Sequence, residues 1–259
     1  MAIQFDFSGE GVFVTDSSRG LGRHIARAFH ALGAKVAIHD KSPVEAEKAV
    51  RELGGGARLL AAPGDLTKTA NIAGITEKAI HSLGRLDVLV CCALQGSLCA
   101  VDRLSEDDFA QAMGTNTKKA FFTTQHCVPA LRATRGVVVH VASTIGLVGG
   151  PTGAVGYATA SGATVQMTRM MALELAAEGI RVNAVCPAWV EADSPAADTV
   201  YAEYIKTRSP LGRLATPDEC AAAVLYLAAP FSGFTVGATL VADGGIASGH
   251  YVTHGNDRE

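Results

Sequence analysis

Short runs of apolar residues alternate along this chain with longer stretches in which apolar residues recur every three or four positions. Gly11-Val-Phe-Val-Thr15 is a run of the first kind and predicts a short buried strand. Residues 20–32 are a stretch of the second kind, because their apolar positions have helical spacing: Leu21, Ile25, Ala28, Phe29 and Leu32. A strand followed by a helix is therefore expected near the amino end.

The same alternation continues through the rest of the chain. Further strands are expected at 35–40, 57–61, 86–91, 136–142, 180–185 and 238–241. Further helices are expected at 43–53, 68–83, 105–131, 156–178 and 217–229. Strands that alternate with helices predict right-handed βαβ units, and hence an α/β fold with one parallel sheet and helices on both of its faces.

The size of the chain indicates one domain. It has 259 residues, of which 48% are apolar and 18% are charged, and these values suit a single globular unit with a sizeable core. We therefore expect one domain over residues 1–259. Within it, residues 188–213 are rich in Ala, Asp, Ser and Pro and are expected to form a flap with a short helix. Residues 246–259 are expected to form a C-terminal tail.

Charge and cysteine content argue against several classes of protein. The net charge of −3 argues against a nucleic-acid partner or an anionic membrane surface. No apolar run approaches the length of a membrane span, and the first residues lack the basic stretch of a secretory signal, so the expected location is the cytoplasm. The cysteines form no Cys-x-x-Cys pair and the histidines show no ligand spacing, so we expect buried thiols and no metal site.

Ligands of such sheets bind at the carboxyl ends of the strands, and several segments there have a specific pattern. Thr15-Asp-Ser-Ser-Arg-Gly-Leu-Gly22 resembles the Thr-Gly-x-x-x-Gly-x-Gly cofactor turn of the short-chain dehydrogenase/reductase family. Other segments match this family in order: Gly64-Asp65-Leu66, Asn116, Ser143 with Gly146, Tyr157, Arg181-Val-Asn-Ala-Val-Cys-Pro187, Pro210-Leu-Gly-Arg-Leu-Ala-Thr-Pro217 and Leu240-Val-Ala-Asp-Gly-Gly245. The resemblance covers about residues 7–246.

The resemblance implies a fold and a set of site residues. The fold is a single-domain Rossmann fold with a seven-stranded parallel sheet in the order 3-2-1-4-5-6-7. The catalytic positions are Asn116, Ser143 and Tyr157, where the tyrosine exchanges a proton, the serine positions the substrate oxygen and the asparagine supports a water relay. The positions that would contact the cofactor NAD are Gly20, Gly22, Asp40 and Asp65.

Three positions near the implied cofactor depart from the family pattern. Asp16 replaces a glycine, and its carboxylate would lie near the two phosphate charges of the cofactor. Leu94, in Cys91-Cys92-Ala93-Leu94, replaces the glycine of the family's Asn-Asn-Ala-Gly segment. Ala192 replaces a threonine that contacts the nicotinamide carboxamide. The alternatives are that Asp16 caps a helix or points to solvent, and that Leu94 turns outward.

A fourth departure concerns the proton transfer itself, because Ser161 occupies the lysine position of Tyr-x-x-x-Lys. In the family this lysine binds the nicotinamide ribose and lowers the pKa of the tyrosine. A free tyrosine has a pKa near 10, so only about 0.1% is phenolate at pH 7, and a neutral serine does not favour the anion. Lys118 and Lys119 follow Asn116 on the same helix, but we expect them on its solvated face.

The departures cluster around the implied cofactor, while the segments that build the strands and helices match the family. We therefore interpret the chain as a pseudoenzyme, a catalytically inactive subunit of a hetero-oligomeric NAD-dependent hydroxyacyl or alcohol dehydrogenase. Its expected partner is a catalytic short-chain dehydrogenase paralogue, in a heterodimer or heterotetramer assembled through the long helices 105–131 and 156–178. The chain itself is expected to bind no cofactor tightly, and the complex is expected to use NAD.

Two other functions agree with the same residues. One is a self-sufficient NAD-dependent alcohol dehydrogenase or ketoreductase in which another group replaces the usual lysine. The other is a non-redox sensor that binds a nucleotide or another ligand without turnover.

Overall fold

The computed structural model of the chain describes residues 4–92, 96, 98–191 and 200–249. The strands are β1 (Gly11–Val14), β2 (Lys35–Ile38), β3 (Leu59–Ala61), β4 (Val88–Cys92), β5 (Val137–Val141), β6 (Arg181–Pro187) and β7 (Thr239–Ala242). The α-helices are α1 (Gly20–Ala31), α2 (Pro43–Glu52), α3 (Thr69–Leu83), α4 (Glu106–Met113), α5 (Lys119–Thr134), α6 (Val155–Leu175), α7 (Val200–Arg208) and α8 (Pro217–Ala228). Shorter helical turns are η1 (Gly114–Lys118), η2 (Thr144–Gly146), η3 (Ala176–Glu178), η5 (Pro230–Ser232) and η6 (Ile246–Ser248).

The strands form one seven-stranded parallel sheet in the order β3-β2-β1-β4-β5-β6-β7. This order confirms the predicted Rossmann fold. The chain runs outward from β1 through β2 to β3 and then returns to β4 on the other side of β1, so the strand order reverses between β1 and β4. The crevice beside the carboxyl ends of these two strands is the place where such sheets bind ligands.

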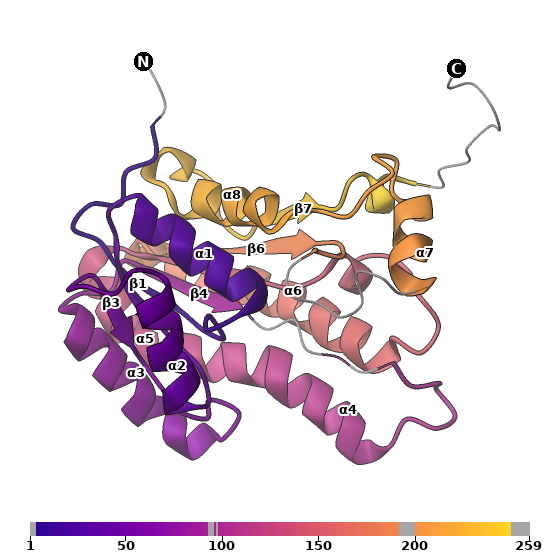
Figure 1. Cartoon of the computed structure of the whole chain (residues 1–259), viewed down its shortest axis with the longest axis horizontal. Coiled ribbons are helices and arrows are strands. Elements are labelled where there is room, and N and C mark those ends of the chain that lie inside the picture. Colours follow the sequence, from indigo (N-terminus) through magenta and orange to yellow (C-terminus); the bar gives the residue numbers. More distant parts are fainter. Residues whose placement is uncertain (1–3, 93–95, 97, 192–199, 250–259) are drawn as a thin grey trace.

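Helices cover both faces of the sheet (Figure 1). One apolar core lies between the sheet and helices α1 and α8, and it includes Phe29 and Val224. A second core lies between the opposite face and helices α3, α5 and α6, and it includes Leu131 and Ala172. Because both faces are covered, β5 is buried along its whole length, which explains its nearly continuous run of valines.

The helix boundaries follow local side-chain chemistry. The Ser105 hydroxyl accepts a hydrogen bond from the backbone N–H of Asp108, 3.1 Å away, and so caps the start of α4. Thr216 and Glu219 form a reciprocal capping box at the start of α8. Helix α3 ends at Gly84, whose φ of 84° gives the left-handed turn that glycine adopts without strain.

Some elements differ from their predicted extents. The strand predicted at 57–61 is shorter and begins at Leu59. The helix predicted at 105–131 is divided into α4 and α5 by the π-helical turn η1, and it continues to Thr134. The predicted helix 156–178 is α6 followed by the turn η3. Periodicity alone does not detect a π-turn, because such a turn inserts one residue without ending the helix.

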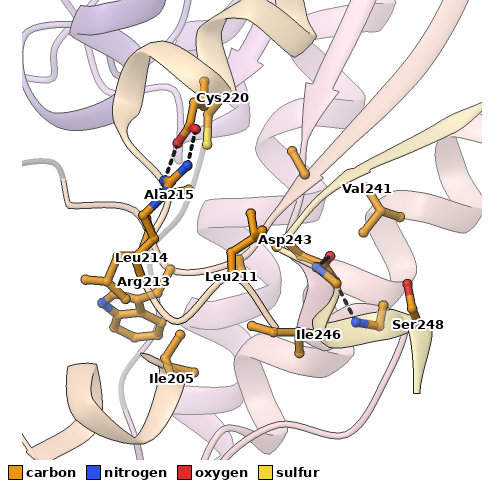
Figure 2. A pocket seen from close by; sticks show the side chains of 17 residues that line it. Ile205, Leu211, Arg213, Leu214, Ala215, Cys220, Val241, Asp243, Ile246 and Ser248 are labelled. Atoms are coloured by element: carbon orange, nitrogen blue, oxygen red, sulfur yellow. Dashed lines mark hydrogen bonds and ion pairs between the residues drawn. The ribbon is translucent and has the colours of Figure 1, made fainter. Parts of the chain in front are cut away.

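The predicted flap at 188–213 contains the short helix α7, and residues 192–199 of it lie outside the described part of the chain. Residues 250–259 of the predicted tail also lie outside the described residues. Beside α7, the carboxyl ends of β6 and β7 and the segment before α8 enclose a cavity of about 560 Å³ (Figure 2). Its lining includes Trp189, Leu211, Arg213 and Asp243.

Candidate functional site

The turn between β1 and α1 is built for close packing of the backbone. Gly20 has a φ of 54°, in the left-handed region that favours glycine. At Gly22, an added Cβ would come within 2.3 Å of the carbonyl oxygen of Asp16. Only glycine therefore lets the first turn of α1 lie against the preceding residues, which is the role that the resemblance implies for Gly20 and Gly22.

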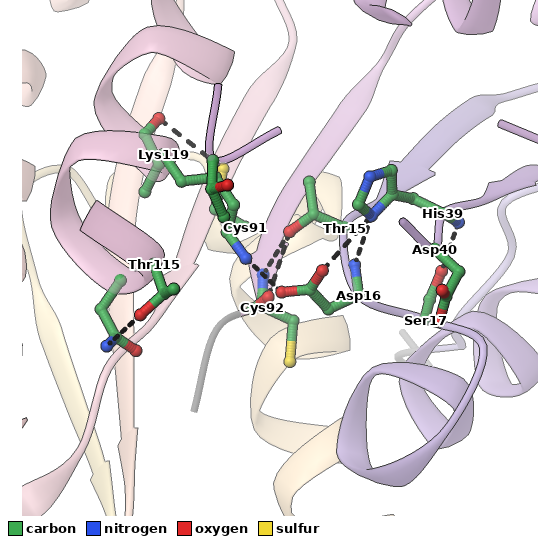
Figure 3. A network of polar contacts seen from close by, with 12 residues as sticks. Thr15, Asp16, Ser17, His39, Asp40, Cys91, Cys92, Thr115 and Lys119 are labelled. Atoms are coloured by element: carbon green, nitrogen blue, oxygen red, sulfur yellow. Dashed lines mark hydrogen bonds and ion pairs between the residues drawn. The ribbon is translucent and has the colours of Figure 1, made fainter. Parts of the chain in front are cut away.

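Asp16 lies in this turn with a φ of 48°, a conformation that few residues other than glycine adopt. Its carboxylate forms an ion pair with the ammonium of Lys119 on α5, and the Lys119 side chain is only 4% exposed (Figure 3). The ion pair joins the β1–α1 turn to α5 at the switch point between β1 and β4. The prediction that Lys119 lies on a solvated face is therefore wrong, whereas Lys118 is exposed as predicted.

His39, at the end of β2, is the second partner of Asp16. Its Nδ1 accepts a hydrogen bond from the backbone N–H of Asp16, 3.0 Å away, and lies 3.4 Å from an oxygen of the Asp16 carboxylate. Its Nε2 lies 2.8 Å from the carbonyl oxygen of Gly64. The ring therefore links the β1–α1 turn to the loop after β3.

The pKa of Asp16 reflects these surroundings. Burial raises it, but the contacts with His39 and Lys119 outweigh burial, so the pKa of the carboxyl lies below its usual range. The hydrogen bond with His39 contributes most to this lowering, followed by the ammonium of Lys119. Asp16 does not cap α1, since the N-cap residue is Arg19 and no side-chain cap bond is formed there.

Asp40 and Asp65 follow β2 and β3, at the same edge of the sheet. The Asp40 carboxylate accepts hydrogen bonds from the Ser18 hydroxyl and from the backbone N–H of Ser42, the latter at 2.7 Å. Asp65 accepts from the backbone and hydroxyl of Thr67, at 3.1 and 2.6 Å. Both carboxylates therefore stabilise the loops in which they lie, and both remain beside the crevice.

The end of β4 carries Cys91 and Cys92, which are both buried. The hydroxyl of Thr15 donates to the carbonyl oxygen of Cys92 and accepts from its N–H, at 3.1 and 3.0 Å, and so ties β1 to β4. Burial raises the pKa of Cys92 to about 12, while the charges of Asp16 and Lys119 act on it in opposite directions. The thiols are therefore protonated at neutral pH. Leu94, the predicted obstruction, lies outside the described residues, as does Ala192.

Asn116 lies within the π-turn η1 and is 4% exposed. Its amide donates to the carbonyl oxygen of Ala112, 2.8 Å away. The next residue, Thr117, donates through its hydroxyl to the carbonyl oxygen of Ala160 on α6, at 2.7 Å. The π-turn therefore positions Asn116 beside the helix that carries Tyr157 and Ser161.

Ser143, Tyr157 and Ser161 come together in one group. Ser143 follows β5, and the other two residues lie one turn apart on α6. Burial raises the pKa of Tyr157 above its ordinary value, and hydrogen bonds with Ser143 and Ser161 oppose this only in part. The backbone of Gly96 lies against the tyrosine ring, because a Cβ added there would come within 2.6 Å of it.

The structure adds two residues to those identified in the sequence, His39 and Lys119. Lys119 precedes the buried residues Thr123 and Cys127 by four and eight positions, which places it on the inner stripe of α5. This spacing is the feature of the sequence that indicates a buried Lys119. His39 gives no comparable signal, because its role depends on the contact between β2 and the β1–α1 turn.

Two features are absent from the part of the chain that the structure describes. Within the described ranges, no group of three or more His, Cys, Asp or Glu residues is arranged to hold a metal ion. Among the helices of those ranges, none is both long enough and apolar enough to cross a membrane.

Comparisons with known proteins agree with this architecture. A family model described as enoyl-(acyl carrier protein) reductase matches residues 16–247. The meso-2,3-butanediol dehydrogenase of Serratia marcescens is 33% identical over 240 residues, which cover 92% of this chain and 95% of the relative. The (2S)-[(R)-hydroxy(phenyl)methyl]succinyl-CoA dehydrogenase subunit BbsD of Thauera aromatica is 33% identical over 241 residues, or 90% of this chain and 94% of the relative.

A solved structure is equally similar. The crystal structure of a short-chain type dehydrogenase/reductase from Mycobacterium marinum has a TM-score of 0.87 and 31% sequence identity. The match covers 93% of this chain and 97% of that protein. Fold, motif order and relatives agree, and the chain belongs to the short-chain dehydrogenase/reductase family.

Proposed function

We propose that this chain is a catalytically inactive subunit of a hetero-oligomeric NAD-dependent hydroxyacyl or alcohol dehydrogenase, and that it supports an active paralogue. The observation that carries the proposal is the environment of Tyr157. Its neighbours on the site side are the neutral hydroxyls of Ser143 and Ser161, and burial raises its pKa above the ordinary value. A tyrosine in this setting holds its proton at neutral pH.

Proton transfer needs a group whose pKa lies near the working pH. A cation beside a phenol favours its anion, and the family places a lysine there. In this chain the nearest buried lysine of the crevice, Lys119, is instead paired with Asp16. General acid–base help is worth roughly 10²–10⁴ in rate, so its loss leaves little turnover.

The crevice fits a dinucleotide poorly. Gly20, Gly22, Asp40 and Asp65 support one, since they keep the close turn and the carboxylates at the edge of the sheet. The Asp16–Lys119 pair opposes it, because it places a carboxylate and a lysine side chain across the switch point where the cofactor would lie. We therefore infer that this chain binds no NAD tightly and that the complex uses NAD bound by the partner.

The outer faces of α5 and α6 support a protein partner. The exposed face of α6 includes the large apolar side chains Met170 and Leu173, and Leu173 is 74% exposed. Phe121 on α5 is also exposed. Exposed apolar side chains that gather on one surface often mark a protein–protein interface. We infer that a paralogue with the same fold covers these two helices.

The relatives are compatible with such an assembly. The name of the Thauera aromatica relative describes it as a subunit of a dehydrogenase. We propose that this chain resembles the non-catalytic subunit of a heteromeric dehydrogenase such as 2-[hydroxy(phenyl)methyl]succinyl-CoA dehydrogenase. A single domain over residues 1–259, with a flap at 188–213 and a tail at 246–259, would present both helices to the partner.

A self-sufficient alcohol dehydrogenase or ketoreductase is the rival function. The observation in its favour is that Asn116, Ser143 and Tyr157 are all in place and that η1 lies against α6. That arrangement supplies the substrate-positioning groups of the family. It lacks only the cation that would acidify Tyr157.

The deciding experiment compares the purified chain with the chain co-expressed with a Tyr-x-x-x-Lys paralogue from the same source. NAD and NADH binding is measured by calorimetry, and NAD reduction is measured with hydroxyacyl-CoA thioesters and secondary alcohols. We expect no NAD binding up to millimolar concentrations and no turnover by the chain alone, with co-purification and turnover in the mixture. Turnover by the chain alone would establish the rival function, and tight NAD binding without turnover would indicate a nucleotide sensor.

A further inference from the structure

The cavity beside α7 is lined by neither the Asp16–Lys119 pair nor Tyr157. Its volume of about 560 Å³ falls within the roughly 300–1,000 Å³ typical of small-molecule sites. Neither Asn116, Ser143 nor Tyr157 lines it. The segments that do so are the carboxyl ends of β6 and β7, helix α7, the segment from Leu211 to Ala215 and the start of α8 (Figure 2).

Large apolar side chains form much of the wall. They come from segments far apart in the sequence: Trp189, Ile205, Leu211, Leu214, Val241 and Ile246. Ile205 and Leu214 are buried, and Trp189 and Ile246 pack against them. These four residues therefore form a small apolar cluster of their own within the wall.

The charged groups of the lining are satisfied within the chain. Arg213 forms two hydrogen bonds with Glu219, Nη1 to Oε2 at 2.8 Å and Nη2 to Oε1 at 2.6 Å. Asp243 accepts hydrogen bonds from the backbone N–H groups of Gly245 and Ala247, at 2.9 and 2.7 Å. Among the described residues that line the cavity, no other side chain carries a formal charge. The one positive charge of the lining is thus taken up by Glu219, and an anionic ligand would lose its hydration without gaining a free counter-charge.

We propose that this cavity is a binding site for a small molecule with an apolar body and no negative charge. The cavity shares none of Asp16, Lys119 and Asp40 with the dinucleotide crevice. It does share Trp189, Ile205 and Ile246 with a smaller hollow that is lined by Ser143. A ligand in the cavity would therefore contact side chains that also line the hollow beside Ser143.

Trp189 makes the proposal directly measurable, because it is the one tryptophan of the chain. Its fluorescence is recorded while the full chain is titrated with octan-1-ol, and calorimetry is run in parallel. Octanoate, which has the same chain length, is the anionic probe. We expect saturable binding of octan-1-ol and at least ~10-fold weaker binding of octanoate, because the carboxylate finds no free positive charge.

Leu211→Lys tests the location of the site. Leu211 lines the cavity and is 63% exposed, so a lysine is tolerated there, and Val44→Lys on α2 is the matched control at 66% exposure. We expect Leu211→Lys to weaken octan-1-ol binding and to strengthen octanoate binding, each by ~10-fold, while Val44→Lys changes neither. Circular dichroism shows whether both variants are folded.

Three results would overturn the proposal. Octan-1-ol that gives no saturable signal rules out the site. Octanoate that binds the native chain as well as octan-1-ol does shows that the ligand class is wrong. If octan-1-ol binds Leu211→Lys and Val44→Lys as tightly as it binds the native chain, its site lies elsewhere on the protein. None of these results depends on NAD binding or turnover, so the function proposed above is tested separately.

Discussion

The ionisation of Tyr157 depends on the charge of the residue one helical turn later. Residues four apart on a helix lie on the same face, and Ser161 is hydrogen-bonded to the phenol and 2% exposed. A buried neutral hydroxyl stabilises a phenolate far less than an ammonium does. The identity of residue 161 therefore sets whether this site exchanges protons near neutral pH.

Ser161→Lys is expected to lower the pKa of Tyr157 by about 1–3 pH units, because a cation within contact distance favours the phenolate. The measurement is an ultraviolet titration of tyrosine ionisation, with Tyr157→Phe used to assign the signal. Ser161→Met, which adds similar length without charge, is expected to leave the pKa high. Equal titration curves for the Lys and Met variants would contradict this account.

Asp16 and Lys119 are expected to depend on each other for stability. Lys119→Met leaves the Asp16 carboxylate without its counter-charge, and breaking a buried pair in this way costs about 3 kcal/mol. Urea unfolding measures the loss. We expect the double variant Asp16→Gly/Lys119→Met to recover most of it, since no unpaired charge then remains.

The same pair gives a pH signature. The pKa of Asp16 is lower in the folded chain than its usual value of 3.8, so its stabilising contribution is present above that value and is lost as the pH falls below it. Lys119→Met is expected to remove this part of the acid dependence. The unfolding free energies of the native chain and of Lys119→Met are therefore expected to converge at low pH. Convergence only above pH 4 would contradict the assignment.

At the scale of elements, His140 links three of them within the core. Its Nδ1 lies 2.8 Å from the hydroxyl of Thr168 on α6, and its Nε2 lies 3.1 Å from the hydroxyl of Thr124 on α5. The Thr168 hydroxyl already donates to the carbonyl oxygen of Thr164, so it accepts from Nδ1–H and Nε2 is unprotonated. A neutral histidine on β5 therefore positions both helices against the sheet.

Burial lowers the pKa of His140 to about 4, compared with an ordinary value of 6.5. Between these values the unfolded chain takes up a proton that the folded chain does not, so stability falls as the pH decreases from about 6.5 to 4, by about 3 kcal/mol. His140→Asn does not titrate and is expected to lack this loss. The difference between the two proteins in urea unfolding from pH 7 to pH 4.5 is the measurement, and parallel pH profiles would contradict the prediction.

The elements themselves were largely predictable. The valine run at 137–141 and the helical spacing at 20–31 are local patterns, and local patterns reveal strands and helices. The site was predictable only where one segment carries the information, as in the turn around Gly22. The Asp16–Lys119 pair joins residues 103 positions apart, and its formation depends on how α5 emerges from the π-turn. Pairing across that distance leaves no signal in a single sequence.

At the scale of the whole molecule, the outer face of α5 and α6 is the surface that we expect a paralogue to cover. It lies on the opposite side of the sheet from α1 and α8. Helix α6 carries Tyr157, and the turn η1 that leads into α5 carries Asn116, so a partner on this face would contact elements that build the site. Assembly and site geometry are therefore coupled through the same two helices.

Leu173→Glu is expected to abolish co-purification with a Tyr-x-x-x-Lys paralogue, because it places a charge on a surface that becomes buried. Leu173 is largely exposed in the isolated chain, so the variant is expected to remain folded. Val44→Glu on α2 is the control and is expected to assemble normally. Undiminished co-purification of Leu173→Glu would show that another face binds the partner.

The buried pair between the β1–α1 turn and α5 also constrains the history of the chain. A single mutation that restores glycine at position 16 strands the ammonium of Lys119 in the core, and a single mutation that removes Lys119 strands the carboxylate. Each single substitution therefore gives a less stable protein than the one that keeps both charges. We expect positions 16 and 119 to change together among similar chains, because selection on stability alone would keep both charges or remove both.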